Sequence, residues 1–259
     1  AVRESRERVK AAIKNSGFHF PFTKVVVNLA PADLKKDGSG LDLAIAMGIL
    51  LATGQINAPE TDEAVFAGEL ALDGAVRGIK GVLPMVLGAK EKGKKVIFVP
   101  EENGAEGAIV EGMKVYTPGF LRDVVEHFTG ENKLVPCVRM GQDNQKSCYH
   151  EMDFSDVKGQ LVAKRALEIA AAGGHNVLLV GAPGAGKTML ARRLPTILPP
   201  MTEEEMLNVT KIYSVAGMLT KEGLVRERPF RSPHHTVSRN ALVGGGRVPK
   251  PGDVTLRLI

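Results

Sequence analysis

One stretch of eight residues in this sequence has the composition and spacing of a loop that binds phosphate groups. It matches the pattern G-x-x-x-x-G-K-[ST] at every required position. In chain order the stretch consists of Gly181, Ala182, Pro183, Gly184, Ala185, Gly186, Lys187 and Thr188. Glycines let the backbone curl so that successive N–H groups point at phosphate oxygens. The pattern therefore predicts that residues 181–188 bind the phosphates of a nucleotide.

The last residues of this loop carry the remaining chemistry. Lys187 is expected to reach the β- and γ-phosphates of ATP as a point charge. The hydroxyl of Thr188 is expected to bind Mg²⁺. A helix that begins near Gly186 would direct its positive end at the same phosphates. The sequence thus predicts ATP and Mg²⁺ as cofactors, with Thr188 as the metal ligand.

The segments around the loop favour this interpretation. Residues 176–180 (NVLLV) form a short apolar run that predicts a strand before the loop. Residues 189–197 predict an amphipathic helix after it. A further helix is expected near residues 160–172, ended by the glycine pair 173–174. Strand, loop and helix in this order are the context in which the phosphate-binding pattern is specific.

Hydrolysis needs acidic residues that this part of the sequence does not supply. A P-loop ATPase holds Mg²⁺ and orients the attacking water with acids at the end of a second apolar strand. No such strand is predicted after Thr188, and the similar run 95–102 (KVIFVPEE) precedes the loop. The acids 203–205 follow Thr202 with the spacing T-x-x-E of a helix capping box, which we favour over a catalytic role. We therefore expect this chain to bind nucleotide with little or no turnover.

Residues 1–130 alternate helix and strand patterns, which predicts a separate α/β domain. Residues 131–150 lack periodicity and are interpreted as a linker, so a second domain would span 151–259. The expected helices of the first domain are 1–15 (ending near Gly17), 41–52, 82–92 and 120–128. Its expected strands are 24–29, 64–68 and 95–99. The last residues, 251–259, read as a strand-like run, and we expect both ends of the chain to be cut points.

Composition restricts the class of protein. Of the 259 residues 44% are apolar and 24% are charged, which is typical of a soluble globular protein. The sequence holds no apolar run of eighteen residues, and its charged start differs from a signal peptide. We therefore expect a cytoplasmic protein without a membrane partner. Cys137 and Cys148 are interpreted as free thiols, because only His150 lies near enough to complete a metal site.

The net charge of +5 is concentrated in the second half of the chain. Residues 1–130 hold 16 Lys and Arg against 17 Asp and Glu, whereas residues 131–259 hold 18 against 12. The last part is richest in basic residues: Arg226, Arg228, Arg231, Arg239, Arg247, Lys250 and Arg257. Such a segment can contact DNA phosphates, and the alternative is a solvated or subunit-facing loop. The adjacent His234 and His235 would point apart on a strand, so they are not expected to share a metal.

With these residues in view, the chain resembles the YifB/ComM family of magnesium-chelatase-like AAA+ proteins along nearly its whole length. The resemblance is carried by VRESRERVKAAIKNSGFHFP, VVVNLAPADLKKDGSGLDLAIAMGIL, GAPGAGKT and, most distinctively, RPFRSPHHT. It implies an ATPase that forms a homo-hexameric ring. Members of the family are linked to natural competence, so the resemblance implies a motor for branch migration of recombining DNA.

The same resemblance sets two further expectations. DFSDVKGQ is similar to the segment that lies beside the adenine in AAA+ proteins. In the family, the sequence after GDVTL continues into a strand with the Walker B acids, and some tens of residues come before the position of Ala1. The chain is therefore expected to be an internal piece that holds a C-terminally truncated AAA+ domain.

The first region is similar to the proteolytic domain of Lon proteases, which has a ribosomal-S5-domain-2-like fold. The clearest stretch is FAGELALDGAVRGIKGVLPMVLGAKEKGKKVIFVPEEN. By eye, the nucleophilic serine position falls on Gly38, with Ser39 beside it, and the catalytic lysine position falls on Leu83. A Ser–Lys dyad needs both groups. The resemblance thus implies a non-proteolytic Lon-like domain, followed by the partial P-loop AAA+ domain.

Four functions remain open from the sequence. The leading hypothesis is an ATP-driven motor acting on DNA, such as a branch-migration helicase. The alternatives are a motor subunit of a magnesium chelatase, a Lon-like peptidase, and an inactive nucleotide-binding module. Gly38 and Leu83 argue against the peptidase. Stimulation of ATP turnover by DNA would separate the DNA motor from the chelatase.

Overall fold

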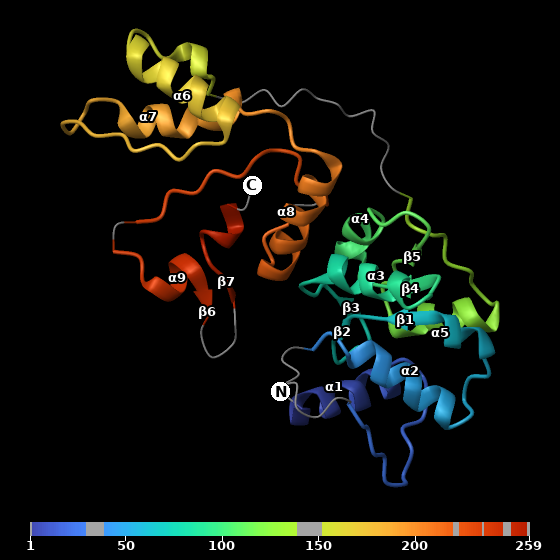
Figure 1. The fold of residues 1–259 in the computed structure, drawn as a ribbon. Helices are drawn as coiled ribbons and strands as arrows, with labels where there is room; N and C mark the ends of the chain where they lie inside the picture. The colour runs from blue at the N-terminus through green and yellow to red at the C-terminus, as the bar shows by residue number, and fades with distance from the viewer. Residues whose placement is uncertain are drawn as a thin grey trace. The chain divides into compact units, whose positions relative to one another are not determined.

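The computed structural model describes residues 2–29, 39–138, 152–219, 223–234, 236–245 and 250–257. The chain divides into two compact units. The first unit consists of Ala1–Met140 and Tyr213–Leu224, and the second of Gly141–Ile212 and Val225–Ile259. Figure 1 shows the elements of both units in chain order.

The first unit combines helices with short strands. Its helices are α1 (Val2–Asn15), α2 (Asp42–Ala52), α3 (Val82–Glu91), α4 (Gly104–Gly107) and α5 (Leu121–Thr129), with 3-10 turns η1 (Pro59–Glu63) and η2 (Glu101–Asn103). Its strands are β1 (Ala64–Phe66), β2 (Glu69–Leu70), β3 (Val76–Arg77), β4 (Val96–Phe98) and β5 (Lys114–Tyr116). Strands β1, β4 and β5 form a parallel sheet with β4 in the centre, while β2 and β3 pair antiparallel. This is a mixed α/β architecture.

Aromatic side chains at the same register position cross the parallel sheet. Phe66 on β1, Phe98 on β4 and Tyr116 on β5 are register partners. The ring centroids of neighbouring partners lie 5.2 Å apart in stacked geometry. Phe98 is fully buried, and the rings of His127 and Phe128 on α5 pack against it. The apolar strands thus bury one aromatic ladder under α5, which fixes their register.

A buried carboxylate joins the first two helices. Asp42, at the start of α2, is 1% exposed and accepts a hydrogen bond of 2.9 Å from Nε of Arg8 on α1. Its other oxygen accepts from the hydroxyl of Ser5. The carboxylate of Asp42 in turn raises the pKa of Arg8. Because a buried charge is costly without partners, these contacts explain how the acidic residue is tolerated inside the core.

The second unit holds the phosphate-loop region and the basic C-terminal region. Its elements are η3 (Phe154–Asp156), α6 (Leu161–Gly173), α7 (Lys187–Arg193), η4 (Leu194–Ile197), most of α8 (Glu203–Ala216), α9 (Arg239–Val243), the paired strands β6 (Gly244–Gly245) and β7 (Lys250–Pro251), and η5 (Thr255–Arg257). Figure 1 shows α6 and α7 beside each other. Between them lies a small apolar cluster of four buried side chains: Phe154, Val157, Leu167 and Leu190.

The last turn of α8 and the segment after it belong to the first unit. The hydroxyl of Ser214 donates a hydrogen bond to the carboxylate of Glu106, which is 6% exposed. The same carboxylate accepts from the backbone N–H of Leu83 at 2.7 Å and from Asn103 at 3.0 Å. The carbonyl of Ser214 accepts from the N–H of Gly81 at 3.1 Å. Three donors around one buried carboxylate satisfy its charge.

The expected helices are confirmed, except that residues 194–197 form the 3-10 turn η4 rather than the end of a helix, and several ends lie near the predicted glycines. Helix α1 is followed by Gly17 at φ 88°, and α6 is followed by its C-cap Gly174 at φ 64°. Both are left-handed conformations that glycine adopts without strain. Of the expected strands, 64–68 and 95–99 are confirmed as the shorter strands β1 and β4.

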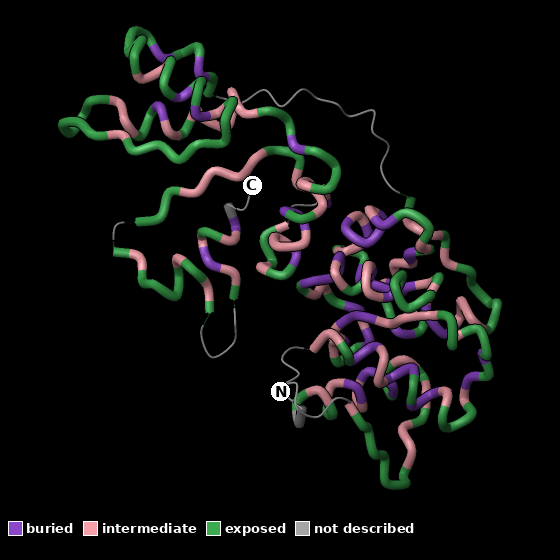
Figure 2. Tube along the Cα trace, viewed as in Figure 1, coloured by how far each residue is buried: buried purple, intermediate pink, exposed green. Residues whose placement is uncertain are grey.

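Three expected strands are wrong. Residues 24–29 and 176–180 form no strand, and 255–257 form the 3-10 turn η5 instead. Both apolar runs lie partly in solvent, as Figure 2 shows by colour, with Val26 77% and Leu178 86% exposed. An apolar run forms a buried strand only when neighbouring strands cover it. Within the part of the chain that the structure describes, neither run has such a neighbour.

No helix among the described residues is both long and apolar enough to cross a lipid bilayer. Several sequence expectations lie outside the described residues. They concern Gly38, Cys148, His150, His235 and Arg247. Cys137, which is described, is a free thiol.

Candidate nucleotide-binding site

The predicted phosphate loop is an exposed turn that leads directly into α7. Residues 181–185 are exposed, and α7 begins at Lys187. Gly184 and Gly186 have φ angles of 80° and 84°, which a residue with a side chain rarely adopts. Within the described residues, the N–H groups of these two glycines donate to no protein acceptor. Gly184 and Gly186 thus lie at positions that require a positive φ, and their N–H groups can donate to a ligand.

The side chain of Lys187 curls back over the loop. Its Nζ donates hydrogen bonds of 2.7 Å to the carbonyl oxygens of Gly181 and Ala182. These carbonyls hold the ammonium group against the first residues of the loop. An anionic ligand would compete for the ammonium group, because hydrogen bonds between two charged groups are stronger than those to a neutral carbonyl.

Thr188 follows Lys187 in the first turn of α7 and is exposed. No group of three or more His, Cys, Asp or Glu side chains in the described ranges is arranged to hold a metal ion. A hydroxyl alone suits Mg²⁺ only as one ligand among phosphate oxygens and waters. The donor set therefore fits a metal that arrives together with a phosphate ligand.

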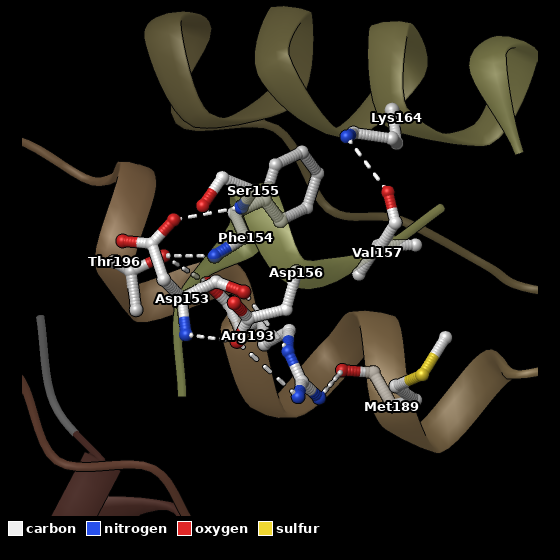
Figure 3. A network of polar contacts seen from close by, with 9 residues as sticks. All are labelled: Asp153, Phe154, Ser155, Asp156, Val157, Lys164, Met189, Arg193 and Thr196. Carbon is white, nitrogen blue, oxygen red and sulfur yellow. Dashed lines mark hydrogen bonds and ion pairs between the residues drawn. The ribbon is translucent and has the colours of Figure 1, made fainter. Parts of the chain in front are cut away.

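A polar network fastens residues Asp153–Val157 to α7 (Figure 3). Nε of Arg193, the last residue of α7, donates to the carbonyl of Asp153 at 2.9 Å. Nη2 of the same guanidinium lies 3.6 Å from the carboxylate of Asp156. The N–H of Phe154 donates to the hydroxyl of Thr196 at 3.2 Å. The segment is thus attached to the same helix that starts in the phosphate loop.

The segment is also closed on itself and bound to α6. The carboxylate of Asp153 accepts from the N–H of Ser155 at 2.7 Å, and that of Asp156 accepts from the N–H of Asp153 at 2.8 Å. This reciprocal pair is a capping box for η3. From α6, Nζ of Lys164 donates to the carbonyl of Val157 at 3.1 Å and lies 5.4 Å from the ring centroid of Phe154.

Gln160 links the start of α6 to the phosphate loop. Its backbone has a φ of 52°, and among the described residues it is the only one other than glycine with a positive φ. Its Nε2 lies 3.5 Å from the carbonyl of Ala185, a long hydrogen bond. A left-handed conformation at a residue with a side chain costs energy and is found where the surroundings hold it in place.

The capping box predicted for Thr202 and Glu205 is confirmed. The N–H of Glu205 donates to the hydroxyl of Thr202 at 3.2 Å, and the N–H of Thr202 donates to the carboxylate of Glu205 at 2.7 Å. Arg228 lies 3.3 Å from the same carboxylate and donates to the carbonyl of Pro199 at 2.8 Å. The hydrogen bond from Thr202, followed by the charge of Arg228, lowers the pKa of Glu205.

The basic residues of the predicted segment therefore differ in exposure and in their contacts. The side chain of Arg228 is 14% exposed and pairs with α8. Arg226, Arg239 and Lys250 are exposed. His234 accepts a hydrogen bond from the N–H of Thr236 at 3.3 Å. Only the exposed cations are placed to meet a polyanion without breaking an internal contact.

The residues at the Lon-like positions show no Ser–Lys pair in the described part of the chain. Leu83 is fully buried at the start of α3. The hydroxyl of Ser39 donates to the carboxylate of Glu69. A carboxylate is a base as well, but it is not the lysine that the dyad requires.

The resemblance placed Asp156 and Gln160 in the segment expected beside the adenine, but it predicted neither their contacts nor the role of Arg193. One signal was available, because the D-x-x-D spacing of Asp153 and Asp156 is that of a capping box. The role of Arg193 had no such signal, since an arginine at the end of a helix most often faces solvent.

Comparison with known proteins extends over both units. A family model described as "Magnesium chelatase, subunit ChlI" matches residues 153–258, and one described as "Subunit ChlI of Mg-chelatase" matches residues 1–103. The chain is thus similar to both models, each over a separate part of its length. Competence protein ComM of Haemophilus influenzae is 42% identical over 257 residues, covering 98% of this chain and 50% of that protein. Protein YifB of Escherichia coli, described as uncharacterized, is 43% identical over 255 residues, with the same coverage.

The chain thus spans about half the length of the curated relatives it matches. A shorter similarity connects it to Lon protease 2 of Bacillus subtilis, 31% identical over 128 residues, which are 48% of this chain and 22% of that protein. This similarity supports the Lon-like expectation in part.

Proposed function

We propose that this chain is the ATP-binding part of an AAA+ motor ATPase, with residues 181–188 as the phosphate-binding loop. The observation that carries the proposal is the loop itself. The N–H groups of Gly184 and Gly186 donate to no described protein acceptor, and two carbonyls of the same loop hold the ammonium group of Lys187. Thr188 would bind the Mg²⁺ that accompanies the phosphates. In this proposal the second unit is a partial P-loop domain that follows a Lon-like, S5-domain-2-like domain.

The direct test is the binding of ATP by the 259-residue chain in the presence of Mg²⁺, measured by isothermal titration calorimetry. Lys187→Ala should weaken binding by about 100-fold or more, because it removes a cation from a triphosphate. Arg165→Ala is a matched control: its partner is Glu168 on α6, and the two side chains are 73% and 46% exposed. The same affinity in the Lys187→Ala and unsubstituted chains would contradict the assignment of the loop.

We further propose that the whole protein acts on DNA, as a homo-hexameric ring in recombination or natural transformation. The similarity to competence protein ComM supports this, together with the exposed cations Arg226, Arg239 and Lys250. Hydrolysis would need acids at the end of a strand, which the described residues after Thr188 do not provide. We therefore expect this chain alone to bind ATP and to turn it over slowly.

The second candidate is a magnesium-chelatase motor subunit. It is favoured by the family descriptions, one of which matches the N-terminal residues 1–103. ATP turnover by the whole protein, with and without single-stranded and branched DNA, separates the candidates. Stimulation by DNA that is lost on replacing Arg226, Arg239 and Lys250 with alanine supports the DNA motor. Turnover that no DNA changes would leave the chelatase subunit as the better proposal.

A further inference from the structure

The guanidinium group of Arg193 connects the helix of the phosphate loop to the segment Asp153–Val157. Two of its nitrogens contact that segment, at the carbonyl of Asp153 and the carboxylate of Asp156. A third, Nη1, lies 3.4 Å from the carbonyl of Met189, one turn earlier in α7. The side chain is only 15% exposed. Figure 3 shows all three contacts made from one side chain.

Apolar contacts hold the same segment independently of Arg193. Phe154 is 5% and Val157 2% exposed, and they pack with Leu167 of α6 and Leu190 of α7. Burial of two such side chains stabilises the position of the segment without a polar contact. Arg193 therefore acts on the orientation of the polar edge of the segment, together with the contact between Phe154 and Thr196, and apolar burial holds the segment in place.

The segment leads directly to the phosphate loop. Three residues after Val157, the amide of Gln160 lies 3.5 Å from the carbonyl of Ala185 in the loop. Residues 157–160 therefore flank the loop. A nucleotide whose phosphates lie in the loop must extend its sugar and base beyond it. The turn 157–160 contacts the loop at Ala185, so it is the candidate surface for the nucleoside.

We propose that Arg193 is a positioning residue for the nucleoside part of the bound nucleotide. This inference rests on the proposed nucleotide site. By fixing Asp153–Val157 against the helix that starts in the loop, Arg193 sets the distance between the phosphate subsite and the surface for the base. The planar guanidinium is suited to this, because it holds three acceptors at once in a fixed geometry that a lysine ammonium cannot reproduce.

The test compares two ligands that share phosphates and differ in the nucleoside. The affinities of the full 259-residue chain for ATP and for inorganic triphosphate, each with Mg²⁺, are measured by calorimetry for Arg193→Ala. We expect the affinity for ATP to fall by about tenfold, the size of a lost charge-assisted contact, and the affinity for triphosphate to stay within about twofold. Arg193→Lys should recover less than half of this loss. Arg192→Ala, an exposed arginine on the same helix, should change neither affinity.

Several outcomes would overturn the proposal. Equal losses for ATP and triphosphate would show that Arg193 acts on the loop or on the stability of the fold. Unchanged binding of ATP would show that it positions nothing for the ligand. If Arg193→Ala does not fold, Arg193→Lys decides by the same comparison of ligands. If the unsubstituted chain binds triphosphate and ATP with the same affinity, the role of Arg193 is contradicted but the assignment of the phosphate loop is not. If the unsubstituted chain binds neither ligand, the proposed nucleotide site is contradicted as well.

Discussion

His127 is a titratable side chain of the first unit whose environment disfavours protonation. Its ring lies among Phe98, Tyr116 and Phe128, with centroids 4.5 to 5.5 Å away. Its Nδ1 accepts a hydrogen bond of 3.1 Å from the N–H of Leu134. Burial and the nearby charge of Lys133 lower the pKa of His127. Protonation would therefore remove an acceptor and place a charge among aromatic rings.

This geometry gives a prediction for stability against pH. Because the folded chain binds the proton less tightly than the unfolded chain, the stabilisation is complete above the ordinary histidine pKa of about 6.5 and is lost as the pH falls toward the lowered value. His127→Gln keeps an acceptor without titrating, so it should flatten the dependence of the unfolding free energy on pH between about 5 and 7. Urea unfolding followed by circular dichroism measures this. His19→Gln, at an exposed histidine of the same unit, is the control; an equal slope in His127→Gln and the unsubstituted chain would refute the assignment.

The position of the phosphate loop could be predicted from the sequence, because its pattern requires a particular backbone conformation as well as particular side chains. Gly184 and Gly186 are required for their positive φ angles, so their positions in the sequence report the local fold. The contacts of Arg193 and Gln160 could not be predicted. Their roles depend on which distant carbonyl each side chain meets, and that is decided by the packing of α6 and α7 around Phe154 and Val157.

At the level of elements, the helices were more predictable than the strands. A helix satisfies its own backbone, and its ends carry local signals such as Thr202 and Glu205 or the glycine at 174. A strand depends on partners elsewhere in the chain. The run 176–180 is as apolar as a buried strand, yet no neighbour pairs with it among the described residues.

Arg228 supports the N-terminal end of α8, which predicts an effect on stability. Arg228→Ala removes both its contact with the carboxylate of Glu205 and its hydrogen bond to Pro199. We expect the melting temperature to fall by a few degrees, as for the loss of other capping contacts. Differential scanning calorimetry measures the change. Arg226→Ala, at an exposed position two residues earlier, should leave the melting temperature unchanged, and equal shifts in the two variants would contradict this role.

The same contact matters for interpreting the basic segment. Weaker DNA binding by Arg228→Ala could result from the loss of a cation or from the loss of the contact that supports the N-terminal end of α8, so this variant does not separate the two causes. In contrast, Arg239 and Lys250 are exposed. Their substitution tests contact with a polyanion directly, and each lost phosphate contact should reduce the salt dependence of binding.

At the level of the whole molecule, the second unit exposes a set of large apolar side chains. Val177, Leu178 and Val180 are 42%, 86% and 86% exposed, and Leu161 and Val162 of α6 are exposed to a similar degree. Exposed apolar side chains next to an unpaired backbone favour association between copies of a chain. The chain is therefore expected to self-associate through this region.

Sedimentation velocity at increasing protein concentration measures this association. Val180→Lys should shift the distribution toward the monomer, because a charge at the unpaired run opposes pairing. Val243→Lys is the matched control, since Val243 is also an exposed valine of the second unit but lies on α9. A chain that stays monomeric at all concentrations, or a control with the same effect, would contradict the prediction.

The return of Tyr213–Leu224 to the first unit has a consequence for biosynthesis. A ribosome releases the chain from its N-terminus, and domains generally begin to fold as they emerge. The first unit, however, cannot place Ser214 against the buried carboxylate of Glu106 until the entire phosphate loop has been translated. Its last contacts form only after most of the second unit exists. The first unit therefore cannot complete its packing on the ribosome until the chain beyond the phosphate loop has emerged, although most of its residues emerge long before.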